Sequence, residues 1–146
     1  MNVRDVCSRN LVSVPISASL SEVAILMRDR RVGAVVVLKG PADEPVAAGI
    51  VTDRDIVRAQ LERASDLSSV CVVDVMTPDP MIVCEDDPVD DVIERMRGFR
   101  VRRAPVVTAR GTLCGLISTD DLVSEIAREL AALARLVELQ PKLEHF

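Results

Sequence analysis

The chain has 146 residues, 18 of them basic and 23 acidic, so its net charge is −5. This length predicts one domain or two small halves packed together, and an apolar share of 49% is enough for a sizeable core, which excludes disorder as the overall state. An acidic chain whose only aromatic residues are Phe99 and Phe146 lacks both the basic face and the stacking platforms of nucleic-acid-binding proteins.

Targeting and metal-binding signals are weak. The first nine residues hold no apolar core of a signal peptide, and the longest purely apolar run, Ala34 to Leu38, is far shorter than the roughly 20 residues of a membrane helix. The cysteines have no C-x-x-C spacing, and the one histidine, His145, is next to the last residue. We therefore expect a cytoplasmic protein with reduced thiols, no metal site and no membrane association.

An internal repeat organises the chain. A shift of 69 positions places Asp5-Val6 on Asp74-Val75 and Met27-Arg28 on Met96-Arg97. After a length change within residues 39–45, where Gly and Pro predict a hairpin loop, a shift of 66 places residues 49–57 on residues 115–123. The sequence therefore contains two copies of one unit of about 60 residues.

Each copy is predicted to form a strand, a helix, two further strands and a second helix, in that order. In the first copy, we expect strands at residues 10–14, 33–38 and 46–51 and helices after Ser19 and over residues 53–61. Ser19 is the expected N-cap of the first helix, with Glu22 completing a capping box. Residues 59–70 join the two halves as a surface connection.

The second copy repeats this order, with different turn and capping residues between its elements. We expect strands at residues 79–83, 104–107 and 113–117, with a turn at residues 109–111. Asp87 is the expected cap of the first helix, with Pro88 in its first position, and the last helix starts at Thr119.

Both copies end on the pattern Gly-apolar-apolar-[Ser/Thr]-x-x-Asp, at Gly49–Asp55 and Gly115–Asp121. A hydroxyl followed three residues later by an acid at the start of a helix is a capping box, which is the ordinary reading of one such motif. The same hydroxyl–carboxylate pair after the same strand and glycine in both halves favours a binding role instead.

With these motifs, the sequence resembles tandem CBS domains, also called a Bateman module, over about Val3 to Ile126. The openings Val3–Val6 and Val73–Thr77, the strands Arg31–Val37 and Val101–Val107, and the two closing motifs carry the resemblance. It implies an α+β fold of two pseudo-twofold-related β-α-β-β-α units packed sheet to sheet, with a C-terminal helix. The expected divisions are residues 1–64, 65–128 and 129–146.

The resemblance also implies a sensor of adenosine-containing ligands: AMP, ADP, ATP, S-adenosylmethionine or NAD. In this family the closing motif holds the ribose hydroxyls, which points here to Thr52 with Asp55 and to Ser118 with Asp121; a carboxylate suits a vicinal diol. The adenine slot of the family points to four apolar residues, for which a plain core role stays open: Val12, Val35, Met81 and Val106.

Phosphates need cations or a helix N-terminus. Family position points to Arg102 and Arg103, and Arg54 is a second candidate beside a helix start, although all three also suit a solvated surface. The copies differ, because Gly33 and Ala34 stand opposite Arg102 and Arg103, and Asp120 stands opposite Arg54. We therefore expect two unequal pockets.

The last helix carries apolar residues at alternating spacings of three and four: Val123, Ile126, Leu130, Leu133 and Val137. This seam suits a homodimer of the kind common in the family, and packing back onto the chain's own domain is the alternative. The expected function is a non-enzymatic regulatory module that acts on an unidentified protein in trans. A dimeric scaffold that has lost ligand binding is the alternative, and an enzyme is the least supported class.

Overall fold

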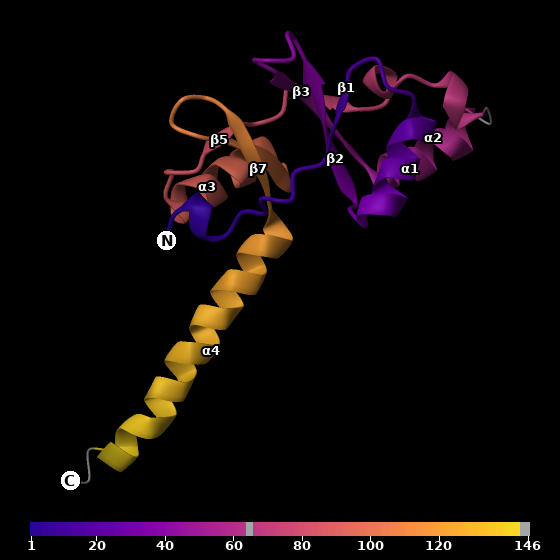
Figure 1. Ribbon diagram of the computed structural model, residues 1–146. Helices are drawn as coiled ribbons and strands as arrows, with labels where there is room; N and C mark the ends of the chain where they lie inside the picture. Colours follow the sequence, from indigo (N-terminus) through magenta and orange to yellow (C-terminus); the bar gives the residue numbers. More distant parts are fainter. Residues whose placement is uncertain (64–65, 144–146) are drawn as a thin grey trace.

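Two small sheets with the same connectivity form the centre of the structure, a computed structural model that describes residues 1–63 and 66–143 (Figure 1). In the first sheet, β1 (Ser13–Pro15) pairs in parallel with β2 (Ala34–Lys39). The next strand, β3 (Val46–Thr52), is antiparallel to β2 and to β4 (Thr77–Pro78). We call the part of the chain packed around this sheet the first unit.

The second sheet repeats this pattern in the second unit. There β5 (Val83–Cys84) pairs in parallel with β6 (Arg103–Val107), which pairs antiparallel with β7 (Leu113–Ser118). The pairing shifts register between Val37 and Leu38 in the first sheet and at the equivalent Val106/Val107 in the second. The duplication therefore extends to local irregularities, and the predicted α+β class of two like units is confirmed.

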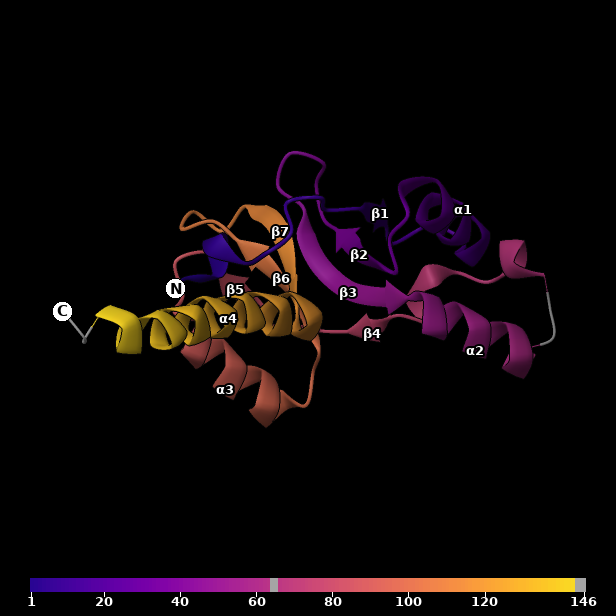
Figure 2. The same cartoon turned by 90° about the horizontal axis from the view of Figure 1, so that it is seen from below.

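In the described part of the chain, four helices accompany the sheets: α1 (Leu20–Arg30) and α2 (Asp53–Arg63) in the first unit, and α3 (Val89–Phe99) and α4 (Thr119–Leu143) in the second. Figure 2 shows α1 and α2 at one end of the molecule and α3 at the other. Short 3-10 turns lie in the connections at η1 (Val3–Asp5), η2 (Leu67–Ser69) and η3 (Val72–Asp74). None of the described helices has the length and apolarity needed to cross a membrane.

The first helix of each unit shows how far local signals define its start. Ser19 caps α1 as predicted, because its hydroxyl accepts from the Glu22 amide at 3.2 Å and the Glu22 carboxylate accepts from the Ser19 amide. The predicted cap of α3 was wrong: Pro88 is the N-cap, with no side-chain cap bond. The Asp87 carboxylate instead accepts from the Cys84 amide at 2.9 Å, before the helix begins.

The openings of the two repeats are exchanged between the units. Val3 is fully buried in the core of the second unit, where its amide donates to the Asp87 carbonyl at 3.0 Å. Val72 is fully buried in the core of the first unit, where its amide donates to the Ala18 carbonyl at 2.9 Å. Each unit is therefore completed by residues that the sequence repeat assigns to the other.

Gly49 and Gly115 lie where these exchanged segments cross β3 and β7. A Cβ atom at Gly49 would lie 2.8 Å from the Thr77 carbonyl oxygen, and one at Gly115 would lie 2.6 Å from that of Ser8. The backbones pair at both crossings, through β3 with β4 and through a bridge between Ser8 and Leu116. The glycine of the closing motif thus permits the close approach of the two repeats.

The exchange also shortens the first strand of each repeat. The predicted strands 10–14 and 79–83 are observed as Ser13–Pro15 and Val83–Cys84. Because Ser8 already pairs with β7, residues 9–12 are used to cross from the second unit to the first. The expected divisions of the chain stay a prediction, and the boundary between residues 64 and 65 and the end of the extension beyond Leu143 lie outside the described residues.

The last helix, α4, extends away from both units over most of its length (Figure 1). The apolar residues of its predicted seam are between 44% and 66% exposed. The alternative that this seam packs back onto the chain's own domain is therefore wrong, and the seam faces solvent along the described helix.

Candidate functional site

The first candidate cavity, of about 220 Å³, lies between the repeats and is here called the Thr52 cavity. The end of β3 and the start of α2 form one wall, and the connections before β5 and β6 form the other. Its lining residues are Ile50, Thr52, Asp55, Thr77, Pro80, Met81, Arg100, Val101, Arg102 and Arg103. The cavity therefore needs both repeats to exist.

The second cavity, of about 200 Å³, is the equivalent of the first in the other half of the repeat. It is here called the Ser118 cavity. The end of β7 and the start of α4 form one wall, and the connections before β1 and β2 form the other. Its lining residues are Ser8, Asn10, Val12, Val32, Gly33, Ala34, Arg103, Leu116, Ser118 and Asp121. The duplication has thus produced two related cavities.

The Thr52–Asp55 pair forms a capping box at the start of α2. The Asp55 carboxylate accepts from the Thr52 amide at 2.8 Å and from the Thr52 hydroxyl at 3.0 Å, and the Asp55 amide donates to that hydroxyl at 3.3 Å. These bonds anchor the first turn and stabilise an acid near the positive end of the helix dipole. The pair thus has a structural role whatever the cavity holds.

The Ser118–Asp121 pair repeats this geometry at the start of α4. The Ser118 amide donates to the Asp121 carboxylate and the Asp121 amide donates to the Ser118 hydroxyl, each at 3.1 Å. In both boxes the bonds to the carboxylate use Oδ2, and Oδ1 makes no hydrogen bond to the described residues. Each half-buried aspartate can therefore cap its helix and also accept a hydrogen bond from a molecule in the cavity.

The cations are unequally divided between the cavities. Arg100, Arg102 and Arg103 line the Thr52 cavity, whereas Arg103 is the only described cation that lines the Ser118 cavity. Arg54 is exposed and lines neither cavity among the residues described there, and Asp120 is exposed beside the Ser118 box. The Thr52 cavity thus has more capacity for an anionic group.

The apolar candidates divide into two groups. Met81 lines the Thr52 cavity and Val12 lines the Ser118 cavity. Val35 and Val106 are fully buried in the two cores and are absent from both linings. A strand residue of this kind can offer a cavity only its backbone.

Arg100 is a lining residue that the sequence analysis missed. It ends α3 in the left-handed conformation, with φ of 58°, as Arg31 ends α1 with φ of 56°. The 69-residue shift aligns these two arginines, which was the one available signal. Thr77, Ser8 and Asn10 were missed as well, because they reach the cavities only through the exchanged openings.

A polar cluster lies next to the Ser118 cavity, around Cys7. The Arg9 guanidinium donates to the Glu85 carboxylate at 2.9 Å, and this bond holds the pKa of Glu85 below its usual range. Burial raises the pKa of the Cys7 and Cys114 thiols. Because the thiolate is the reactive form, neither cysteine is activated as a nucleophile.

Comparisons with known proteins match both repeats and most of the chain. The uncharacterized protein YlbB of Bacillus subtilis is 34% identical over 133 residues, which cover 90% of this chain and 87% of that protein. An uncharacterized protein of Methanopyrus kandleri, MK0525, is 28% identical over 123 residues, which cover 84% of this chain but only 61% of that protein.

A solved structure has the same fold. The CBS domain protein PAE2072 of Pyrobaculum aerophilum, complexed with AMP, is 32% identical with a TM-score of 0.73, and the match covers 90% of this chain and 99% of that one. The family model described as CBS domain matches residues 3–62 and again residues 72–128. Since one model accounts for both repeats, the chain belongs to the CBS-domain family.

Proposed function

We propose that the protein is a non-enzymatic regulatory module that binds an adenosine-containing ligand of the AMP, ADP or ATP type between its two repeats. The observation that carries this proposal is the pair of related cavities, each with a hydroxyl–carboxylate pair on one wall and the opposite repeat on the other. The AMP complex of the Pyrobaculum aerophilum relative supports the ligand class. S-adenosylmethionine and NAD belong to the same class.

In this proposal, Asp55 and Asp121 accept hydrogen bonds from ribose hydroxyls through their free Oδ1 atoms, beside Thr52 and Ser118. Met81 and Val12 contact the base, and the backbone of the strands that contain Val35 and Val106 reads its edge. Arg102 and Arg103, joined by Arg100, hold the phosphates in the Thr52 cavity. Arg54 is exposed at the second position of α2 and would reach only a ligand that extends beyond the described lining.

The cavity volumes support signalling by conformational change. Sites for drug-sized ligands usually enclose about 300–1,000 Å³, whereas the two cavities enclose about 220 and 200 Å³. In this proposal a nucleotide enlarges its cavity by moving the repeats relative to each other, and a partner protein in trans reads that movement. A cytoplasmic location and the absence of catalytic activity belong to the same proposal.

A calorimetric titration with AMP tests this function. We expect Asp55→Asn to weaken binding by about 10- to 100-fold, because a charge-assisted bond to the ribose is worth about 1.5–3 kcal/mol. Asparagine keeps an acceptor oxygen for the capping box, so the fold is retained. Asp121→Asn, the matched change in the cavity with fewer cations, is expected to leave this binding almost unchanged.

The dimeric scaffold is a second candidate, favoured by the fact that both hydroxyl–carboxylate pairs already form capping boxes at their own helix starts. It predicts that neither nucleotides nor adenosine produce heat or raise the melting temperature of the wild-type protein. That result would refute the sensor. Two equal sites in the titration would instead contradict the inequality of the cavities.

A further inference from the structure

The linings of the Thr52 and Ser118 cavities correspond closely under the repeat. Met81 in the first cavity and Val12 in the second, for example, are 69 positions apart in the sequence. Arg103 departs from this correspondence, because it lines both cavities and no other described lining residue does. Its repeat equivalent, Ala34, lines the Ser118 cavity alone and carries no charge. One cation therefore borders two binding spaces.

The place of Arg103 in the fold explains this double contact. It begins β6 and pairs with Ser118 of β7, so it lies beside the Ser118–Asp121 box of its own unit. It also directly follows residues 100–102, the connection that forms one wall of the Thr52 cavity. The side chain is therefore half-buried at the junction of the two cavities.

The guanidinium of Arg103 is available to a ligand, since every ion pair among the described residues involves other side chains. A guanidinium binds a phosphate through two parallel hydrogen bonds from one edge of its plane. Because the group carries a single positive charge, a phosphate held in one cavity neutralises the attraction that Arg103 offers to a phosphate in the other.

The two cavities differ in the charges that remain once Arg103 is engaged. The Thr52 cavity keeps Arg100 and Arg102, whereas the described lining of the Ser118 cavity keeps no cation and includes the Asp121 carboxylate. A phosphate in the Ser118 cavity would then be repelled without compensation. An adenosyl compound without a phosphate needs no cation and escapes this repulsion.

We propose that the two cavities share Arg103, so that a nucleotide in the Thr52 cavity leaves the Ser118 cavity selective for an adenosyl compound that carries no phosphate. The inference rests on the proposed function, which supplies the ligand class, and adds a division of ligands between the two sites. It also makes the sites interdependent, because a first phosphate lowers the affinity for a second by the coupling free energy that Arg103 carries.

Calorimetry measures this coupling by comparing the Ser118 cavity in two contexts. In the wild type AMP fills the Thr52 cavity first, so the weaker of its two binding steps reports the Ser118 cavity with Arg103 engaged. Met81→Trp places an indole where the proposal puts the base, so AMP binds this variant only in the Ser118 cavity, with Arg103 available. We expect the second AMP step of the wild type to be weaker than AMP binding to Met81→Trp by about 10-fold or more. Adenosine should bind the Ser118 cavity equally in the two contexts.

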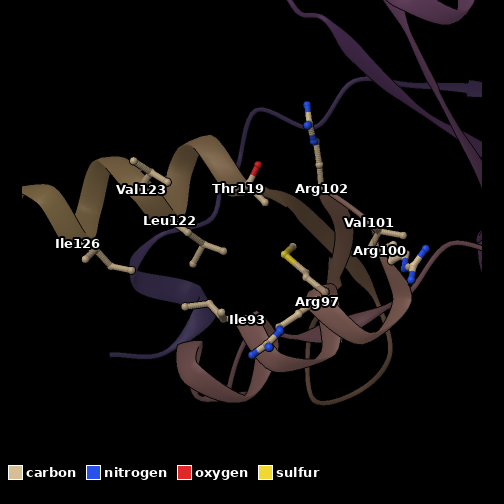
Figure 3. A pocket seen from close by; sticks show the side chains of 10 residues that line it. Ile93, Arg97, Arg100, Val101, Arg102, Thr119, Leu122, Val123 and Ile126 are labelled. Atoms are coloured by element: carbon tan, nitrogen blue, oxygen red, sulfur yellow. The ribbon is translucent and has the colours of Figure 1, made fainter.

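Arg103→Ala separates sharing from simple repulsion between two bound phosphates. Introduced into both proteins, it should remove the difference between the two contexts, because the shared charge is gone. Arg97→Ala is the matched control. It also removes one arginine from the second unit, but Arg97 lines neither cavity among the residues described there, and Figure 3 shows it pointing away from Arg102. With Arg97→Ala, the difference between the contexts should persist.

Two results would overturn the sharing while leaving the proposed function intact. One is AMP that binds Met81→Trp no more tightly than it binds in the second step of the wild type, and the other is a difference that persists in Arg103→Ala. A wild type that binds neither AMP nor adenosine would refute the proposed function and the sharing with it. Thermal unfolding verifies that each variant is folded, and Pro80→Trp, at a half-buried position of the same lining, fills the Thr52 cavity if Met81→Trp does not fold.

Discussion

Gly49 and Gly115 are the residues at which the two repeats approach most closely on each side. Each lacks the one atom that would collide with a backbone carbonyl of the opposite opening segment, Thr77 or Ser8. The closing motif thus combines two functions within seven residues: a glycine that admits the other repeat, and a capping box that presents a carboxylate to the resulting cavity.

Replacing either glycine by alanine tests this role. We expect Gly49→Ala and Gly115→Ala each to lower the free energy of unfolding by about 1–3 kcal/mol, because the backbone must shift to admit the methyl group. Gly98→Ala is the control: its Cβ would meet nothing within 4 Å, and helical alanine is favoured over glycine by about 0.5–1 kcal/mol. Denaturant unfolding measures all three, and unchanged stability in Gly49→Ala would contradict the close approach.

The residues of the site were predictable from the sequence to the extent that their geometry is local. Thr52 and Asp55 are three residues apart in one helical turn, so spacing alone placed them together. The position of Arg100 in the Thr52 cavity depends on a left-handed turn and on which repeat lies opposite it. Neither feature can be read from a pattern of residue types. The location of Val35 and Val106 in the cores likewise follows from which face of a strand is covered.

At the scale of elements, the exchange of η1 and η3 makes the two units depend on each other. The sequence predicted the helices and the hairpins, because their hydrophobic periods and turn residues are local signals. It did not reveal that Val3 packs with Met81 and Val83, or that Val72 packs with Leu20 and Val23, because a repeat aligns equivalent residues without saying which copy they contact.

Cavity-forming substitutions make this dependence measurable. We expect Val3→Ala and Val72→Ala each to cost about 1–3 kcal/mol, since both side chains are fully buried. Hydrogen exchange should then show Val3→Ala loosening β6 and β7, and Val72→Ala loosening β2 and β3. Val73→Ala, in the same segment as Val72 but 41% exposed, serves as the control and should stay within about 0.5 kcal/mol of wild type. Protection lost in the substituted residue's own repeat instead would contradict the exchange.

At the scale of the whole molecule, α4 links the Ser118 cavity to the exposed apolar stripe of the predicted seam. Its first turn carries the Ser118–Asp121 box, and its outer part carries the exposed apolar residues Leu130, Leu133 and Val137. The spacing of that stripe was evident in the sequence, but its direction was not, because the same residues would serve a helix folded back onto its own domain. The structure shows the direction of the stripe, because α4 continues past Leu122 as one uninterrupted helix over the described residues.

The predicted homodimer is tested through the exposed apolar residues of α4. We expect Leu133→Glu to weaken self-association by about 100-fold or more, because the substitution places a charge in the predicted seam. Sedimentation velocity of the full chain measures the change, and a wild-type protein that stays monomeric would contradict the predicted homodimer.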